Sequence, residues 1–136
     1  MSYHLFLDDY RMPDYVAEYI IPVELRTIYT SYKWVVVRSY EEFVVCIEQQ
    51  GLPGVVSFDY DLAEEHYKYA RLHQEISYPD YNVMGNFKVK TGYDCAKWLL
   101  GYLERNQLPC PIIYCHSMNV LGKAGILGLF SKQRIR

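Results

Sequence analysis

Short apolar runs alternate with amphipathic segments along the chain. The runs 3–7, 34–37, 55–58 and 111–115 have the length and the β-branched or aromatic content of buried strands. Two intervening segments, 40–47 and 96–103, repeat apolar residues at helical spacing. Strands that alternate with helices predict an α/β fold. We therefore expect an open parallel sheet of four core strands with helices on both faces.

Local start and stop signals support these helices. Ser39 and Thr91 each begin a capping motif, with an acidic residue three positions later, and Gly51 is a plausible helix end. Residues 14–29 also have roughly helical spacing, but Pro22 should interrupt a helix there. The glycine-containing tail after residue 119 predicts a last helix.

One segment departs from the alternation of strands and helices. Residues 62–76 could form a helix, whereas 77–90 are rich in turn formers and predict an irregular loop. No internal repeat, low-complexity tract or linker divides the chain. The sequence therefore predicts a single domain over residues 1–136.

Composition narrows the class of protein. The chain has 136 residues, of which 51% are hydrophobic and 22% charged, and this excludes intrinsic disorder. Fourteen basic and sixteen acidic side chains give a net charge of −2. That balance argues against an extended nucleic-acid coat, although it allows a small basic pocket. Because no apolar stretch approaches the length of a membrane span, we expect a soluble, cytoplasmic protein with no membrane partner.

The cysteines do not form a metal-binding or redox motif. Cys46, Cys95, Cys110 and Cys115 have no C-x-x-C spacing, so we interpret them as reduced, buried thiols. Zinc ligation by Cys110, Cys115 and His116 would need a second pair of ligands, and none stands nearby.

Polar side chains follow three of the four predicted strands. They are Asp8 and Asp9, then Asp59 and Asp61, then His116 and Ser117. Ligands of open parallel sheets bind at the carboxyl ends of the strands, where these residues would meet. Four crowded carboxylates need a compensating charge, and their oxygen atoms suit Mg²⁺ or Mn²⁺. Such an ion polarises a phosphoryl oxygen or activates water.

Each of these residues also has a structural interpretation. Aspartates at strand ends often cap helices or form turns, and His116 could be a buried structural histidine. Thr91 and Asp94 are best explained as caps. His66 and His73 lie on one helical face and are best explained as packing or surface residues.

Five segments, in the same order along the chain, resemble one known family. They are LFLDDYRMP (5–13), VRSYEE (37–42), SFDYDL (57–62), TGYDCAKWL (91–99) and HSMN (116–119). These resemble the cyclic-phosphate processing receiver-like domains, a family related to the receiver domains of bacterial response regulators. The resemblance implies a receiver-like (flavodoxin-like) fold. It also implies a role in handling cyclic phosphates in RNA repair or nucleotide metabolism, including in phages.

The resemblance implies roles for individual residues. Asp8 and Asp9 would match the acidic pair that holds a metal in receivers, and Asp59 would match the phosphoacceptor position. Asp61 and His116 resemble features of the cyclic-phosphate family itself. Two departures stand out. Residues 62–90 are longer than the family suggests and could be an insert or lid. The family pattern Pro-Val-Gly-Arg after HSMN is replaced by VLGK.

These observations give a leading hypothesis: a metal-dependent phosphoesterase acting on the cyclic phosphate of a nucleotide or RNA end, in the host cytoplasm if the protein is phage-encoded. The metal, Mg²⁺ or Mn²⁺, would be held by Asp8, Asp9 and Asp59. The catalytic residues would be Asp59, Asp61 and His116, and the substrate would be bound by Arg11, Ser117 and Asn119.

Three alternatives remain open at this point. The chain could be a non-catalytic module that binds a nucleotide or a protein partner. It could be a phosphorylation switch, although no fifth strand with the required lysine is evident. It could also be a phosphatase of the haloacid-dehalogenase type. The D-x-D motif of this chain, Asp59-Tyr60-Asp61, however, follows the third strand and lacks the Thr or Val that usually comes next in those phosphatases.

Overall fold

Four parallel strands form one sheet in the computed structural model, which describes residues 2–20, 22–63, 65–66 and 89–134. The strand order is β2-β1-β3-β4, and the elements are β1 (His4–Leu7), β2 (Trp34–Val37), β3 (Val55–Phe58) and β4 (Ile112–Cys115). His4 lies opposite Trp34 on one side and Val55 on the other. The expected four-stranded parallel sheet is therefore confirmed.

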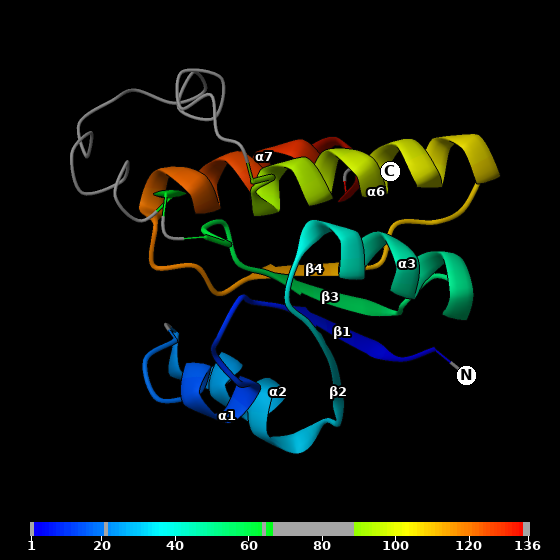
Figure 1. The fold of residues 1–136 in the computed structure, drawn as a ribbon. Helices are drawn as coiled ribbons and strands as arrows, with labels where there is room; N and C mark the ends of the chain where they lie inside the picture. Colours follow the sequence, from blue (N-terminus) through cyan, green and yellow to red (C-terminus); the bar gives the residue numbers. More distant parts are fainter. Residues whose placement is uncertain (1, 21, 64, 67–88, 135–136) are drawn as a thin grey trace.

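Helices cover both faces of the sheet, as expected (Figure 1). One face carries α1 (Pro13–Val16), the 3₁₀ turn η1 (Val23–Leu25) and α2 (Arg26–Ser31); the other carries α3 (Tyr40–Gln50), α6 (Gly92–Asn106) and α7 (Val120–Arg134). Pro22 interrupts the first helical region, since it precedes η1. No helix among the described residues is both long and apolar enough to cross a membrane.

The alternation of side chains along β1 separates two hydrophobic clusters. Leu5 and Leu7 point to the larger cluster beneath α3, α6 and α7, whereas Phe6 points to a smaller one with α1 and α2. Phe43 of α3 and Phe58 of β3 are fully buried in the larger cluster. Both faces of β1 are therefore covered by hydrophobic clusters.

The predicted caps form and fix where α3 and α6 begin. Ser39 Oγ accepts a hydrogen bond from the backbone N–H of Glu42 (3.1 Å), and Thr91 forms a reciprocal capping box with Asp94. Gly51 ends α3 with φ of 89°, a left-handed value that favours glycine. Thr91 and Asp94 are thus capping residues, as their spacing suggested.

The helix and loop expected within 62–90 lie largely outside the described residues, as does His73, so this expectation stays a prediction. At the described base of that segment, His66 is fully buried. Its Nδ1 accepts a hydrogen bond from the N–H of Leu62 (2.9 Å), and its Nε2 donates to the carbonyl of Val89 (2.6 Å). His66 therefore joins the residues on the two sides of the segment.

None of the four cysteines forms a disulfide; Cys46, Cys95 and Cys115 are buried, and Cys110 is partly buried. Burial raises the pKa of the Cys115 thiol to about 12, so this group stays protonated. Among the described residues, no group suited to metal binding includes a cysteine. Three of the four cysteines are therefore buried, as expected, whereas Cys110 is not.

Candidate functional site

Asp8, Asp59 and His116 lie side by side where β1, β3 and β4 end. Backbone hydrogen bonds continue the sheet to these residues, from Asp59 N to Leu7 O (3.0 Å) and from His116 N to Phe58 O (3.0 Å). The chain leaves β1 toward one face of the sheet and leaves β3 toward the other (Figure 1). The three side chains therefore meet at the topological switch point, where ligands bind in this class of fold.

Asp8 is fully buried and accepts four hydrogen bonds. Its Oδ1 accepts from the backbone N–H groups of Tyr10 (3.0 Å) and Arg11 (2.8 Å). Its Oδ2 accepts from Arg11 Nε (2.9 Å) and from His116 Nε2 (3.0 Å). Burial alone would raise the pKa of Asp8, but His116 and these amides outweigh it and lower the pKa to about 2. Asp8 is therefore ionised near pH 7, and its hydrogen bonds hold its carboxylate in place.

Arg11 connects the two central carboxylates. Besides its bond to Asp8, its Nη2 lies 3.1 Å from Asp59 Oδ2, and the side chain is 4% exposed. Its Nη1 donates to the hydroxyl of Tyr19 (2.7 Å), which donates to the backbone carbonyl of His116 (2.9 Å). These contacts close a ring of hydrogen bonds through Arg11, Asp8, His116 and Tyr19. The ring fixes the position of the Arg11 guanidinium.

A second arginine fixes the loop that carries Asp8. Arg38, just beyond β2, donates through Nη1 to the backbone carbonyls of Asp8 (3.1 Å) and Arg11 (2.7 Å). Its Nη2 lies 3.2 Å from the sulfur of Met12. Arg38 therefore acts on the backbone of this loop rather than on the carboxylates.

His116 lies next to Asp8 and is fully buried. Its ring stacks on Phe6, with ring centres 4.3 Å apart, and its Nδ1 lies 2.7 Å from Ser57 Oγ. Ser57 Oγ in turn lies 2.7 Å from the hydroxyl of Tyr29. Burial lowers the pKa of His116 despite the opposing influence of Asp8, so the ring is neutral near pH 7.

Asp59 has an incompletely compensated charge. It is 1% exposed; its Oδ1 accepts from the N–H of Tyr60 (2.9 Å). Its Oδ2 is close to Arg11 but is not aligned for a hydrogen bond, and it is a buried side-chain oxygen without a hydrogen-bond partner in the described part of the chain. Burial and the nearby Asp8 raise the pKa of Asp59 to about 8, because Arg11 offsets them only in part.

A second polar group lies next to this cluster. The Nδ2 of Asn119 is 3.4 Å from both carboxylate oxygens of Asp61. Asn119 Oδ1 accepts from the N–H of Gly122 (3.0 Å) in α7, and its own N–H donates to Ser117 Oγ (3.1 Å). Burial, with a smaller contribution from Asp9, raises the pKa of Asp61 to about 6 even though Asn119 opposes the shift.

The donor set fits a divalent cation in part. Asp8, Asp59 and His116 offer atoms that all lie within 4.8 Å of one another. However, His116 Nε2 and Asp8 Oδ2 already bond to each other and to Arg11. Asp59 Oδ2, which has the ion pair with Arg11 but no hydrogen-bond partner in the described part of the chain, is the atom that suits a hard cation. Asp9 is partly exposed at the same edge and lies near Asp61.

The structure brings together most of the residues proposed from the sequence. Asp8, Arg11, Asp59 and His116 are in direct contact; the adjacent group contains Asp61, Ser117 and Asn119. Sequence reasoning missed three hydroxyls of the network, that of the partly buried Tyr19 and those of the buried Tyr29 and Ser57. Ser57 did give a signal, because it is a lone polar residue in the apolar run Val55–Phe58.

The sequence model of one family, the cyclic-phosphate processing receiver domain, matches residues 3–132. The chain belongs to this family. The match includes all four strands and every residue of the cluster described above. No curated protein and no solved structure matches the chain. Family membership places this receiver-like domain in cyclic-phosphate processing and agrees with its all-parallel sheet.

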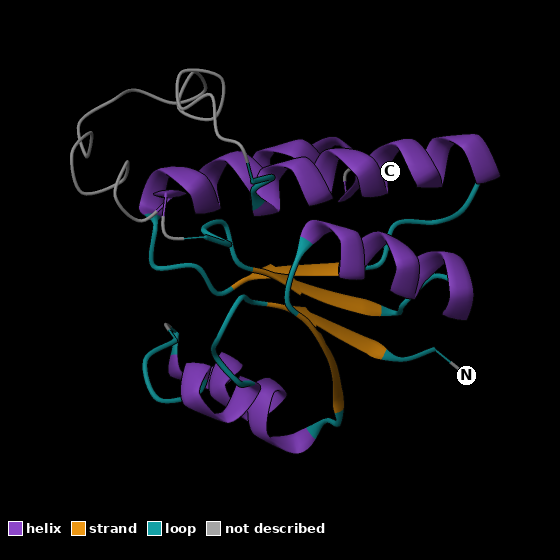
Figure 2. Ribbon diagram, in the orientation of Figure 1, coloured by secondary structure: helices purple, strands orange, loops and turns teal. Residues whose placement is uncertain are grey.

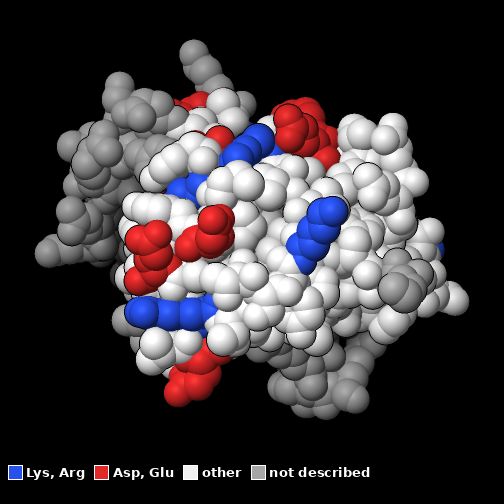
Figure 3. Space-filling view, turned by 90° about the horizontal axis from the view of Figure 1, so that it is seen from below, with Lys and Arg blue, Asp and Glu red and all other residues white. Residues whose placement is uncertain are grey.

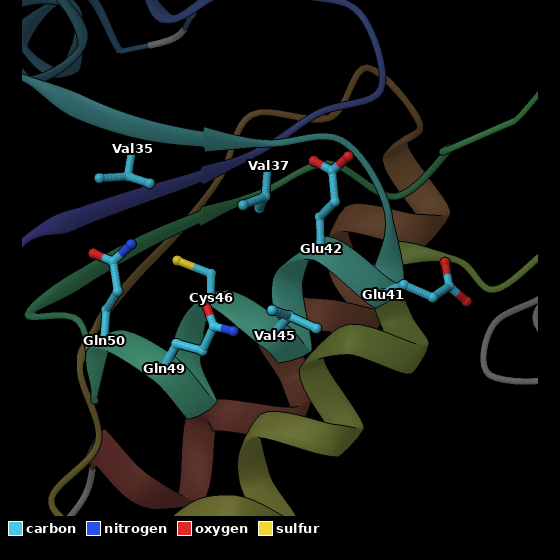
Figure 4. Close-up of a pocket in the computed structure, with 8 residues that line it drawn as sticks. All are labelled: Val35, Val37, Glu41, Glu42, Val45, Cys46, Gln49 and Gln50. Carbon is cyan, nitrogen blue, oxygen red and sulfur yellow. The ribbon is translucent and has the colours of Figure 1, made fainter.

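Two hollows lie beside the edge strand β2, away from the carboxylates. A groove of about 400 Å³ between β2 and α3 is lined by valines, two glutamates, two glutamines and Cys46 (Figure 4). A hollow of about 290 Å³ on the opposite face is lined by Tyr29, Tyr32 and Trp34 among others. Neither is lined by a carboxylate from the strand ends.

Proposed function

We propose that this receiver domain is a phosphoesterase that hydrolyses a cyclic phosphate of a nucleotide or RNA end with the help of a divalent cation. The observation that carries the proposal is the ion pair between Arg11 and the buried Asp59 Oδ2, an oxygen without a hydrogen-bond partner among the described residues, at the switch point of the sheet. A guanidinium attracts phosphate, and an undercompensated carboxylate attracts a cation. Phosphate hydrolysis commonly uses both kinds of group.

The cation would be held by Asp59 and Asp9. We assign Asp8 a different task, since His116 and Arg11 already bind its Oδ2. Mg²⁺ or Mn²⁺, when bound, supplies positive charge that polarises a phosphoryl oxygen. The carboxylate oxygens of Asp59 and Asp9 have the hard character that these ions prefer.

The remaining residues bind phosphate and move protons. Arg11 would face a phosphoryl oxygen with the N–H groups that the carboxylates do not use. Ser117 and Asn119 would hold the substrate from the loop that precedes α7. Asp61, oriented by Asn119, would take the proton of the attacking water, since burial brings its pKa to about 6. His116 has no exposed surface and supports Asp8 through its hydrogen bond.

The bond changes of this reaction balance without a further reactant. The oxygen of a water molecule forms a new bond to phosphorus, and one of the two ester P–O bonds of the ring breaks. The proton that leaves the water is returned to the departing sugar oxygen. The product is a phosphate monoester.

The test is turnover of 2′,3′-cyclic nucleotides with Mg²⁺ or Mn²⁺ and with EDTA. We expect turnover with the metal, loss in EDTA, and loss in Asp59→Asn. Asp14→Asn, which changes an exposed aspartate of α1, is the matched control and should keep full activity. Turnover that survives both EDTA and Asp59→Asn would refute the metal-assisted mechanism.

A binding module is the competing outcome of the same experiment. The central carboxylates and Arg11 are almost completely buried, which is also compatible with binding a nucleotide without reaction. Tight binding of a cyclic nucleotide that persists in EDTA, with no phosphate monoester formed, would favour that function.

A further inference from the structure

We propose that Tyr29 and Ser57 are positioning residues, which hold the guanidinium of Arg11 in place through His116 and Asp8. The inference rests on the proposed function only in taking Arg11 as the group that faces the phosphate. It concerns hydroxyl groups that lie on the far side of His116 from the substrate. The family match assigns no role to either of them.

The four groups form an unbroken, buried chain. Tyr29 to Ser57 is 2.7 Å, Ser57 to His116 Nδ1 is 2.7 Å, and His116 Nε2 to Asp8 Oδ2 is 3.0 Å. Tyr29 is 3% exposed and the other three residues are fully buried. Because no solvent can replace a missing partner there, each donor and acceptor depends on its neighbour in the chain.

The direction of the chain follows from the charge of Asp8. The carboxylate of Asp8 already accepts from two backbone N–H groups and from Arg11 Nε, so it is an acceptor toward His116 as well, and His116 carries its proton on Nε2. Nδ1 of the neutral ring is then an acceptor, and the Ser57 hydroxyl donates to it. The Ser57 oxygen in turn accepts from the Tyr29 hydroxyl, because the Ser57 proton is already engaged. All hydrogen bonds therefore run from Tyr29 toward Asp8.

The chain acts on Arg11 at two points. Asp8 Oδ2 accepts from His116 and from Arg11 Nε, so the orientation of the imidazole determines where Arg11 Nε is held. The backbone carbonyl of His116 also accepts from Tyr19, the hydroxyl that Arg11 Nη1 contacts. Where such outer partners orient the ligands of a metal, their removal typically changes activity or affinity by about 10- to 100-fold, and we take that range as the guide here.

The alternative of a nucleophilic Ser57 does not fit the structure. Serine, histidine and aspartate follow one another here in the order of a hydrolase triad. However, Ser57 has no exposed surface and its oxygen is already bonded to Tyr29. A substrate phosphorus cannot reach it, so the hydroxyl serves to orient the ring.

The experiment measures the state of these hydrogen bonds without substrate, by ¹⁵N NMR of the His116 ring and of the Arg11 side chain. Wild-type protein should carry the proton on Nε2, with Nδ1 shifted by hydrogen bonding and Arg11 Nε–H exchanging slowly with water. Ser57→Ala should move Nδ1 toward the resonance of a ring nitrogen without a donor. It should also speed exchange of Arg11 Nε–H with water, because the acceptor of that N–H is held less firmly.

Tyr29→Phe removes only the first hydroxyl of the chain and should give the same changes at smaller size. Tyr3→Phe is the matched control. It deletes a hydroxyl that donates to Gly51 O (2.7 Å) at the other end of the sheet, and it should leave His116 and Arg11 unchanged. Ser57→Thr, which keeps a hydroxyl at this position, should give the same His116 and Arg11 resonances as the wild-type protein.

The outcomes separate this inference from the proposed function. A proton on Nδ1 in the wild-type protein would overturn the inference, as would Arg11 exchange that Ser57→Ala leaves unchanged. The NMR result stands whether or not cyclic phosphates are hydrolysed, and absence of turnover would refute only the proposed function. With turnover, Ser57→Ala should lower kcat/KM by about 10- to 100-fold, and Tyr3→Phe should not change it.

Discussion

Asp59 combines two properties that rarely occur together at a residue without a ligand. Its carboxylate is buried, and one oxygen lacks a hydrogen-bond partner in the described part of the protein. Such an atom costs stability unless a proton or a cation compensates it. The pKa of Asp59, raised to about 8 by burial and Asp8, expresses the same cost as a preference for the proton.

This preference predicts a pH dependence of stability in EDTA. The folded protein keeps the Asp59 proton up to a pKa of about 8, whereas the unfolded chain loses it near pH 4. The native state therefore binds more protons, and stability falls as pH rises, by at most about 1.4 kcal/mol per pH unit for one proton. Between about pH 6.5 and 8.5, urea unfolding should show this decline in the wild-type protein and a flatter profile in Asp59→Asn.

The choice of pH range isolates Asp59. Asp61, with a pKa raised to about 6, contributes the same sign of change mainly below this range. Asp14→Asn, at the exposed control position, should keep the wild-type slope. Equal slopes in wild type and Asp59→Asn would show that Asp59 is ionised throughout, and that Arg11 compensates it fully.

Arg11 provides a second prediction at the residue scale. Removing its charge leaves the buried anion Asp8 and the neighbouring Asp59 without a cationic partner. Breaking a buried ion pair in this way typically costs about 3–5 kcal/mol. Arg11→Met should therefore lower the free energy of unfolding by that amount. Arg105→Met, at an exposed position in α6, should change it by less than about 1 kcal/mol. Similar losses in the two variants would contradict the role given to Arg11.

At the scale of elements, two glycines let helices approach the loop after β3. A Cβ added at Gly92, the first residue of α6, would overlap with the backbone carbonyl of Asp59; one at Gly122, in α7, would overlap with the ring of Tyr60. The N–H of Gly92 also donates to Tyr60 O (2.8 Å). Both helix starts are therefore packed against the segment that presents Asp59 and Asp61.

Alanine substitutions test this packing. Gly92→Ala and Gly122→Ala should each destabilise the fold by about 1–3 kcal/mol or more, because backbone or a buried ring must move. Gly101→Ala, in the middle of α6, meets only the flexible end of Arg105 and should be neutral or stabilising, since alanine is the better helix former. Thermal unfolding of the three variants measures the difference. A loss in Gly101→Ala as large as in the other two would refute the packing argument.

The elements themselves could largely be predicted from the sequence. Strands and helices followed hydrophobic periodicity, and Ser39, Thr91 and Gly51 marked boundaries through local hydrogen bonds and backbone conformation. The ends of the helical region 14–29 could not be predicted as well. Its short pieces, α1, η1 and α2, are fixed by packing against Phe6 and Tyr29 rather than by their own propensity.

At the scale of the whole molecule, topology explains which parts of the site the sequence could predict. Parallel strands bring their carboxyl ends to one edge, so the convergence of Asp8, Asp59 and His116 followed from strand order alone. The role of each of these three residues could not be predicted from topology in the same way. Whether Asp8 binds a metal or Arg11 depends on side-chain directions and on the Tyr19 and Ser57 hydroxyls, and these are set by long-range packing.

The charge of the whole molecule limits how an RNA substrate could be bound. The net charge is −2, and Figure 3 shows acidic and basic side chains interspersed on the face it presents, without a continuous basic surface. Affinity for an RNA end should therefore come from the terminal cyclic phosphate and few backbone contacts. We expect the slope of log K against log salt concentration to be about −1 to −2, the value for one to three neutralised phosphates.

This last prediction compares oligonucleotides that differ only at the 3′ end. An RNA ending in a 2′,3′-cyclic phosphate should bind to the Asp59→Asn variant, in which we expect no turnover, at least about tenfold more tightly than the same RNA ending in hydroxyls. The salt slopes of the two should differ by about one phosphate contact. A slope steeper than about −4, shared by both RNAs, would instead mean that binding depends on a broad basic surface. Recognition would then not be centred on the strand ends, and Arg11 could not be its main determinant.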